Sequence, residues 1–321
     1  MMHATRVRPG FLSRLWRTDR PLTAVGLLMT AVLIGNLVGL VGDPRTITGA
    51  PAWLKPAKFA VSTAIYSVTL AWLFSFLPDW RRTRTIAGWT TAVVFVIEVG
   101  IIDVQAWRGT TSHFNTGTLA DAVLFSVMGA AIALQTITSG FVAYALWRQP
   151  FTDQLVATAL RAGMVITVLG ASAAGLMTVP TRAQLQAMES THSLPVSGAH
   201  TVGAPDGGPG LPGTGWSRQH GDLRVPHFFG LHAIQVLPIL ATVLRRRRDP
   251  HEAVRMVRIA AASYATLCAV LLVEALRGEP LIGPGLLTRM LFVVWALGST
   301  AAFVAARTSS VNPSDSTMAR A

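Results

Sequence analysis

Long apolar runs alternate with short polar connections along the whole chain. The runs are continuous and poor in charge, and each is about 20 residues long, the length that an α-helix needs to cross a bilayer. They lack the short alternating strands that are typical of outer-membrane barrels. The pattern therefore predicts an all-α, polytopic integral membrane helical bundle with about eight transmembrane helices. The predicted spans cover residues 22–41, 57–77, 86–107, 119–147, 156–179, 225–244, 259–276 and 285–306.

The rest of the chain is expected to flank and connect a single bundle. Residues 1–21 form a basic tail, residues 22–306 the transmembrane bundle, and residues 307–321 a second tail. The first run lacks a small-residue cleavage site, so we expect it to remain as an uncleaved span. The longest connection, residues 180–222, is predicted to be non-helical and is rich in Gly and Pro in its second half. Such a loop is either a disordered tether or an ordered cap over a site.

Composition supports the membrane class and excludes others. The chain of 321 residues is 51% hydrophobic and 13% charged, and that charge is about half of what an average soluble domain carries. The net charge of +12 does not indicate nucleic-acid binding, because the basic residues are spread between apolar runs and do not cluster with aromatic residues on one face. The single cysteine, Cys268, excludes an internal disulfide, a CxxC redox pair and a CxxCH haem-attachment motif.

The positions of the basic residues predict the orientation in the membrane. Eight spans place both termini on the same side, and most of the 27 Lys and Arg residues fall in the tails and connections of that side. Short loops rich in Lys and Arg stay in the cytoplasm. Both termini are therefore expected to be cytoplasmic. The lipid bilayer is the expected partner of the chain, and residues 245–248, four consecutive arginines, are expected to anchor the topology.

Ionisable side chains gather in the outer halves of the predicted spans and in the outer loops. The inner halves hold hydroxyl and amide groups, and Arg161 near the cytoplasmic edge is their only ionisable residue. A charge in hydrocarbon costs at least about 2.5 kcal/mol, so buried carboxylates and imidazoles usually face a cavity or a partner. This asymmetry predicts a polar pocket in the extracytoplasmic half of the bundle.

The stretch GDLRVPHFFGLHAIQ carries two histidines, His227 and His232, into the sixth span. Pro226 is expected to start the helix, and the helix dipole in the first turn favours a neutral His227 imidazole, which can ligate a metal or haem. A spacing of five residues turns the two rings about 140° apart, so they do not share a face as an i,i+4 metal pair would. Structural histidines that hydrogen-bond within the bundle are the alternative.

A second stretch, EVGIIDVQAWRGTTSHFN, concentrates polar groups around the end of the third span. Glu98 and Gln105 are seven residues apart and share a helix face, while Asp103 points elsewhere. Glu98 falls near the middle of the membrane, so it is expected to be protonated or paired. Arg108 and His113 follow in the loop just above. A ligand site and a structural ion-pair network both fit this arrangement.

The third stretch, WLKPAKF, holds the only two lysines of the chain, Lys55 and Lys58. Lys58 is expected near the N-terminal end of a helix, where the dipole disfavours a cation. An anion should therefore compensate it, and Glu98, Asp103 or a bound ligand are the candidates. Snorkelling of both lysines to the membrane interface is the alternative.

At WLKPAKF, QAWRGTTSHFN and GDLRVPHFFGLHAIQ the sequence resembles a group of uncharacterised multi-pass membrane proteins from high-GC, actinobacterial-type bacteria. The resemblance covers most of the chain, and the three strings are quite specific to that group. It implies a helical membrane fold and a location in the cell membrane. The group has no assigned activity, so the resemblance implies no chemistry.

The favoured functional hypothesis is a pocket in the extracytoplasmic half that binds a small anionic or lipid-like ligand, in a receptor or transport role. Lys55, Lys58 and Arg108 would engage the charge of the ligand, with Glu98 and Asp103 beside them. Broken spans, which mark many transporter sites, are not evident. The lack of ionisable groups in the inner halves argues against a proton-driven carrier.

Two cofactor-based hypotheses and a structural or assembly role are the alternatives. A haem b redox protein would use His232 with His113 or His227 as axial ligands. A zinc-dependent intramembrane hydrolase would use His113, His227 and His232, with Asp103 or Glu98 as ligand or general base. Against zinc, the chain has no HExxH spacing. The sequence leaves open whether the protein is an enzyme and what its oligomeric state is.

Overall fold

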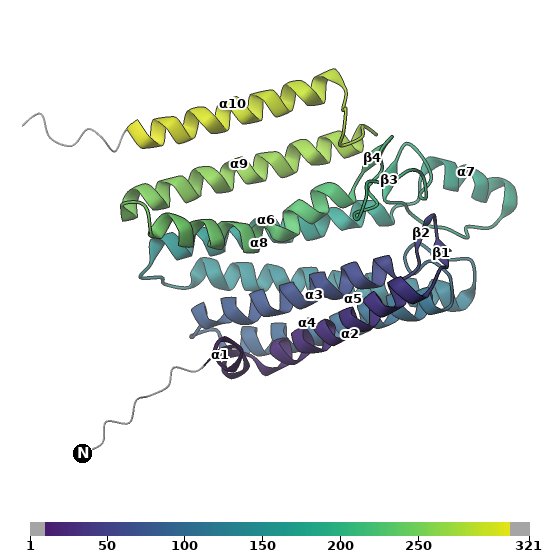
Figure 1. Cartoon of the computed structure of the whole chain (residues 1–321), viewed down its shortest axis with the longest axis horizontal. Coiled ribbons are helices and arrows are strands. Elements are labelled where there is room, and N and C mark those ends of the chain that lie inside the picture. The colour runs from purple at the N-terminus through teal and green to yellow at the C-terminus, as the bar shows by residue number, and fades with distance from the viewer. Residues whose placement is uncertain (1–9, 309–321) are drawn as a thin grey trace, which may run out of the picture. The chain divides into compact units, whose positions relative to one another are not determined.

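The computed structural model describes residues 10–308 and is mainly helical there (Figure 1). Eight of the helices in this part of the chain are long and apolar enough to cross a membrane, which confirms the predicted class and the number of candidate spans. The parts of the predicted tails that fall on residues 1–9 and 309–321 lie outside the described residues. The candidate spans are Arg20–Gly42, Leu54–Phe76, Arg81–Trp107, Leu119–Arg148, Gln154–Thr191, Arg224–Arg245, Pro250–Leu276 and Leu286–Arg307.

The chain packs as two compact units. Unit 1 comprises Met1–Ala145 together with His192–Val196, and unit 2 comprises Leu146–Thr191 together with Ser197–Ala321. The apolar runs have similar compositions throughout, so the sequence carries no signal that separates them into groups. Each unit has its own core and is described by itself below.

Unit 1 is a group of helices that meet in one apolar core. Val25 of the first span, Ala60 of the second and Phe95 of the third are among its buried residues. The end of the unit where the hairpin β1 (Thr46–Ile47) and β2 (Ala50–Pro51) and the loop of residues 108–118 lie is called the loop end. Its helices are α1 (Phe11–Thr18), α2 (Arg20–Gly42), α3 (Leu54–Leu73) with η1 (Phe74–Phe76), α4 (Arg81–Trp107) and α5 (Leu119–Arg148), whose last residues belong to unit 2.

Residues 11–18, which were predicted to be part of a tail, form helix α1 instead. Helix α1 ends before Asp19, whose backbone is extended. The Asp19 carboxylate accepts a hydrogen bond from Leu22 N (2.9 Å) and so caps the N-terminus of α2. Arg84 in α4 donates to Thr18 O (3.0 Å) and holds the end of α1 in place. The apolar residues between the arginines make α1 amphipathic.

A short segment from the second half of the chain completes the loop end of unit 1. Thr116 donates through its backbone N to Pro195 O (2.9 Å) and through Oγ1 to Leu194 O. Asn115 forms an isolated β-bridge with Val196. The loop that follows α4 is therefore closed by residues that are distant in the sequence.

Unit 2 is organised around a close crossing of two helices. A Cβ atom added to Gly170 or to Gly230 would lie 2.5 Å from the Cα of the other glycine, so the two backbones touch. Helices approach this closely only where small residues meet. The packing role predicted for the run GASAAG is confirmed at Gly170 but not at Gly175, where nothing lies within 4 Å of an added Cβ. The helices of unit 2 are α6 (Gln154–Ala173) with η2 (Ala174–Thr178), α7 (Arg182–Thr191), α8 (Arg224–Arg245), α9 (Pro250–Leu276) and α10 (Leu286–Thr308).

Helix α9 begins at Pro250, well before the predicted start of the seventh span at residue 259. Asp249 caps it by accepting hydrogen bonds from His251 N (2.9 Å) and Glu252 N (3.3 Å), and Pro250 occupies the favoured first position. The prediction placed the boundary where the charged residues start. A transmembrane helix can continue beyond the hydrocarbon, so charged residues do not mark its end.

The region of residues 180–222 was predicted to be non-helical, and that prediction is wrong for α7. Thr181 and Gln184 form a reciprocal capping box, in which Thr181 N donates to Gln184 Oε1 (2.8 Å) and Gln184 N donates to Thr181 Oγ1 (3.3 Å). Further on, β3 (Thr201–Val202) pairs with β4 (Gly221–Asp222). The ordered alternative for this loop is therefore the one observed.

Replacing Gly170 by Ala is expected to destabilise the protein, because the new methyl group forces α6 and α8 apart. Over-packing of this kind costs about 1–3 kcal/mol. Gly298→Ala in α10 is the matched control, since nothing lies within 4 Å of the added Cβ and the change should be neutral or slightly stabilising. Thermal unfolding of both variants in detergent measures the difference. Equal midpoints would contradict the close crossing.

Candidate functional site

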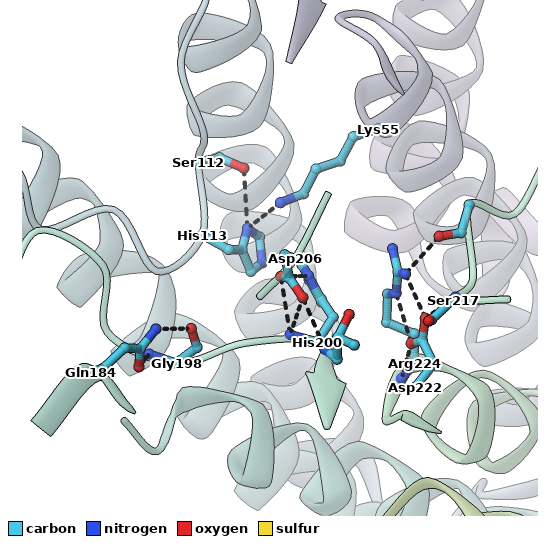
Figure 2. Close-up of polar contacts among 12 residues, drawn as sticks. Lys55, Ser112, His113, Gln184, Gly198, His200, Asp206, Ser217, Asp222 and Arg224 are labelled. Carbon is cyan, nitrogen blue, oxygen red and sulfur yellow. Dashed lines mark hydrogen bonds and ion pairs between the residues drawn. The ribbon is translucent and has the colours of Figure 1, made fainter. Parts of the chain in front are cut away.

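Three polar side chains lead from the loop end of unit 1 into its apolar core. Glu98 lies on α4 about 14 Å from the C-terminal end of the helix and is 2% exposed. His113, from the loop after α4, places Nε2 3.4 Å from Glu98 Oε1. The Nδ1 atom of the same ring lies 3.0 Å from Nζ of Lys55, which is in the first turn of α3. Figure 2 shows Lys55 and Ser112 both pointing at this imidazole.

The donors around His113 define its role. An ammonium group only donates, so Nδ1 accepts from Lys55, and it also lies 3.1 Å from Ser112 Oγ. In the neutral ring the proton is then on Nε2, facing Glu98. The other carboxylate oxygen, Glu98 Oε2, is buried and has no hydrogen-bond partner among the described residues. A buried carboxylate with an unpaired oxygen is costly, so Oε2 is the group in this site that a proton or a donor would satisfy.

The site is open at its lysine end and closed at its glutamate end. Lys55 is half-buried, and the His113 side chain is 21% exposed. Phe59 forms one wall, because its ring lies 5.6 Å from the His113 ring and 5.9 Å from Lys55 Nζ. The aromatic face attracts the ammonium group and excludes water from one side of it. Solvent therefore reaches Lys55 and His113 before it reaches Glu98.

Arg108, a predicted ligand-binding residue, is paired within a second polar cluster. Its NH1 atom donates to Asp121 Oδ1 (2.7 Å) and to Gln105 Oε1 (2.5 Å), and Gln105 Nε2 also donates to Asp121 Oδ1 (2.9 Å). Thr118 Oγ1 donates to the other oxygen of Asp121 (2.7 Å). These bonds join the end of α4 to the start of α5 and so fix both ends of the loop that carries His113.

The remaining predicted residues of unit 1 lie beside this site. Asp103 points away from Glu98, as predicted, and accepts a hydrogen bond from Asn36 Nδ2 of α2 (3.2 Å). Lys58 lies one turn beyond Lys55 on α3 and is half-buried. Of the five predicted ligand-binding residues, the structure therefore brings Lys55 and Glu98 to one histidine and gives Asp103 and Arg108 other partners.

The two histidines of α8 in unit 2 are both held through Nδ1. His227 Nδ1 donates to Gly170 O (2.8 Å), and His232 Nδ1 donates to Gln235 Oε1 (3.3 Å). The His232 ring also packs against Phe228 at 4.4 Å. Helix α8 begins at Arg224, before both histidines, so their rings are separated around its axis as the spacing predicted. These contacts fix the orientation of both rings.

Among residues 10–308, no group of three or more His, Cys, Asp or Glu side chains is arranged to hold a metal ion. The zinc hypothesis required such a group from His113, His227, His232 and a carboxylate. In unit 2, His227 and His232 lie on one helix, whereas haem b takes its two imidazoles from different segments. In unit 1, His113 is engaged by Lys55 and Glu98.

Two carboxylates that the sequence analysis did not single out order the long loop of unit 2 (Figure 2). Asp206 accepts hydrogen bonds from His200 N (3.1 Å) and Thr201 N (2.9 Å), and its Oδ2 lies 2.6 Å from His200 Nδ1. Burial acts to raise the pKa of Asp206, but the hydrogen bonds and the charge of His200 outweigh it and hold this pKa well below its usual range. Asp222, which is 4% exposed, pairs with Arg224 (2.6 Å).

The ordered loop caps the ends of α8 and α9. Gly221 in β4 lies so close to α9 that an added Cβ would come within 2.0 Å of Ala275 O. The Trp216 ring packs against Phe228 at 5.5 Å. An ordered loop was one of the two alternatives, and these contacts hold it against the two helices.

No family model, no curated protein and no solved structure matches this chain.

Asp206→Asn is expected to loosen the cap, because the amide loses the charge that His200 and the two backbone N–H groups engage. Hydrogen bonds to charged groups contribute about 1.5–3 kcal/mol. Hydrogen exchange should rise at residues 199–206 in the variant, and Glu189→Gln on the exposed face of α7 is the control. In the wild type the stabilisation is complete above the ordinary carboxyl pKa of about 4 and is lost as pH falls below it. Unchanged exchange in Asp206→Asn would contradict this role.

Proposed function

We propose that this chain is a multi-pass plasma-membrane protein that binds a small carboxylate anion at Lys55, in a receptor or transport role, and that Glu98 takes up a proton when the anion binds. The observation that supports the proposal is the buried Glu98 carboxylate, linked through His113 to Lys55, with one oxygen unpaired.

Lys55 is the cation that an anionic ligand would meet. It lies in the first turn of α3, where the helix dipole disfavours a positive charge and a negative neighbour is favourable. Glu98, which is linked to Lys55 through His113, can provide that negative charge when no ligand is bound. Because Lys55 is half-buried and Glu98 is 2% exposed, an anion approaching from the loop end reaches the lysine first.

Binding of an anion at Lys55 changes the electrostatic environment of the Glu98 carboxylate. An anion that pairs with the ammonium group weakens the countercharge on which the buried carboxylate depends. A carboxylate in an apolar environment without a cation binds a proton. His113 relays the proton: once the anion engages Lys55, Nδ1 of the partly exposed ring takes a proton from solvent while Nε2 passes its own proton to Glu98, so the imidazole stays neutral. One proton is therefore taken up for each anion bound.

The orientation is part of the proposal. The arginines of unit 1 lie mainly at the end opposite the loop end, in α1, at the start of α2 and at the start of α4. Basic ends of spans face the cytoplasm. Both termini are then cytoplasmic, the membrane is the inner membrane of a bacterial cell, and Lys55 is on the extracytoplasmic side.

The test is the binding of acetate and benzoate to purified protein in detergent, measured by isothermal titration in a mildly acidic and a mildly alkaline buffer. The wild type should bind more tightly in acid, by up to about tenfold per pH unit, since one proton accompanies each anion. Lys55→Gln should abolish binding in both buffers. Glu98→Gln, which mimics the protonated acid, should bind with little dependence on pH.

Lys58→Gln is the matched control, because it removes the same charge one turn along α3. A wild type that binds neither anion in either buffer would contradict the proposal. Equal loss in Lys55→Gln and Lys58→Gln would show that a diffuse positive potential, and not the Lys55 site, attracts the anion. If anion binding by Glu98→Gln depended on pH as strongly as binding by the wild type, Glu98 would not be the group that takes up the proton.

A further inference from the structure

An open apolar groove lies in unit 1, at the end opposite the loop end. Its volume is about 450 Å³, within the usual range for sites that hold small molecules. Trp16, Arg20 and Ala24 line one side of it, and the other side is formed by α4. The lining residues of α2 and α4 extend for about 10–12 Å along each helix. The groove is therefore long and narrow, and it runs along a membrane span.

The lining has the chemistry of an amphiphile site. On the α4 side it consists of Trp89, Ala92, Val93 and longer aliphatic side chains, and the one charged lining residue of the groove is Arg20. Arg20 starts α2, so its guanidinium group is at the mouth. Tryptophan residues are enriched where a membrane meets water. A hydrocarbon chain matches the wall, and an anionic group matches the mouth.

The surroundings of the mouth add positive charge. Arg14 and Arg17 are exposed on α1, and Arg81 and Arg82 are exposed at the start of α4. Asp19 is the one acidic residue in α1 and at its junction with α2. It is 8% exposed, and its carboxylate faces Leu22 N and Gly88 of α4. It does not offer its carboxylate to the arginines of the mouth.

Helix α1 places this mouth at a bilayer surface. Its exposed side chains include Phe11 (54%), Leu12 (49%) and Trp16 (43%), while Leu15 packs inward. A short helix with basic residues and exposed aromatic and leucine side chains lies in the interface between headgroups and acyl chains. Arginines at the mouth and an apolar wall beyond them match the order of phosphate and acyl chain in one lipid molecule.

We propose that this groove binds an anionic phospholipid, with one acyl chain between α2 and α4 and the headgroup phosphate at Arg20. A zwitterionic phospholipid has an acyl chain that fits the same wall, but its headgroup cannot neutralise the arginines. This site uses residues other than those of the anion site at Lys55, so the two proposals are tested by different variants.

The test is native mass spectrometry of the full chain in detergent, titrated with phosphatidylglycerol and, separately, with phosphatidylcholine. The wild type should retain one phosphatidylglycerol in preference to phosphatidylcholine. Arg20→Gln should weaken phosphatidylglycerol binding about fivefold, the effect of one basic residue at a membrane surface. Ala24→Phe should also weaken it, because Ala24 is exposed in the groove and a phenyl ring there occupies the space of the acyl chain without entering the core.

Arg218→Gln is the control for net charge, because Arg218 is exposed in the long loop of unit 2. Unaltered thermal midpoints show that the variants are folded. Loss in Arg20→Gln without loss in Ala24→Phe would mean attraction to the surface only, and it would overturn the groove. Equal retention of both lipids by the wild type would also overturn the proposal. A dimer that forms in the wild type and disappears in Ala24→Phe would overturn it as well, because a second copy of the chain would then be the occupant of the groove.

Discussion

Polar groups inside an apolar helical bundle must find their partners within the protein, because hydrocarbon offers none. In unit 1 the partner of the buried Glu98 comes from a loop, since His113 reaches it from beyond the end of α4. That loop is in turn fixed by the cluster around Asp121. In unit 2, Asp206 and Asp222 organise the cap in the same manner. The loops are therefore as much a part of the folded core as the helices are.

Helix α4 connects the two ligand sites proposed for unit 1. Its Ile97 lines the groove, and the next residue, Glu98, faces the polar site. Neighbouring residues on a helix point about 100° apart, so the surface that lines the groove and the buried carboxylate lie little more than a quarter of a turn apart on α4. A movement of α4 that accommodates an acyl chain acts on both. The close packing of Gly88 against Asp19 ties the same helix to the start of α2.

The apolar pattern of the sequence was sufficient for the helical class and for the eight candidate spans, because a run long enough to cross a bilayer is a strong and local signal. Helix ends that continue into charged sequence, as at Pro250, carry no such signal. The contact between Lys55 and His113 was not predictable, because it joins the start of α3 to the loop that follows α4. The pairing of His200 with Asp206 depends on the path of a Gly- and Pro-rich loop, which only the three-dimensional fold determines.

The contribution of His192–Val196 to unit 1 constrains the order in which the protein is made. The ribosome completes the helices of unit 1 long before it reaches these residues, and α6 and α7 are synthesised in between. Until then Thr116 lacks the carbonyl groups of Leu194 and Pro195 that it bonds in the finished protein. The N-terminal half consequently enters the membrane with an incomplete loop around His113, and it matures only when translation has passed into the second half.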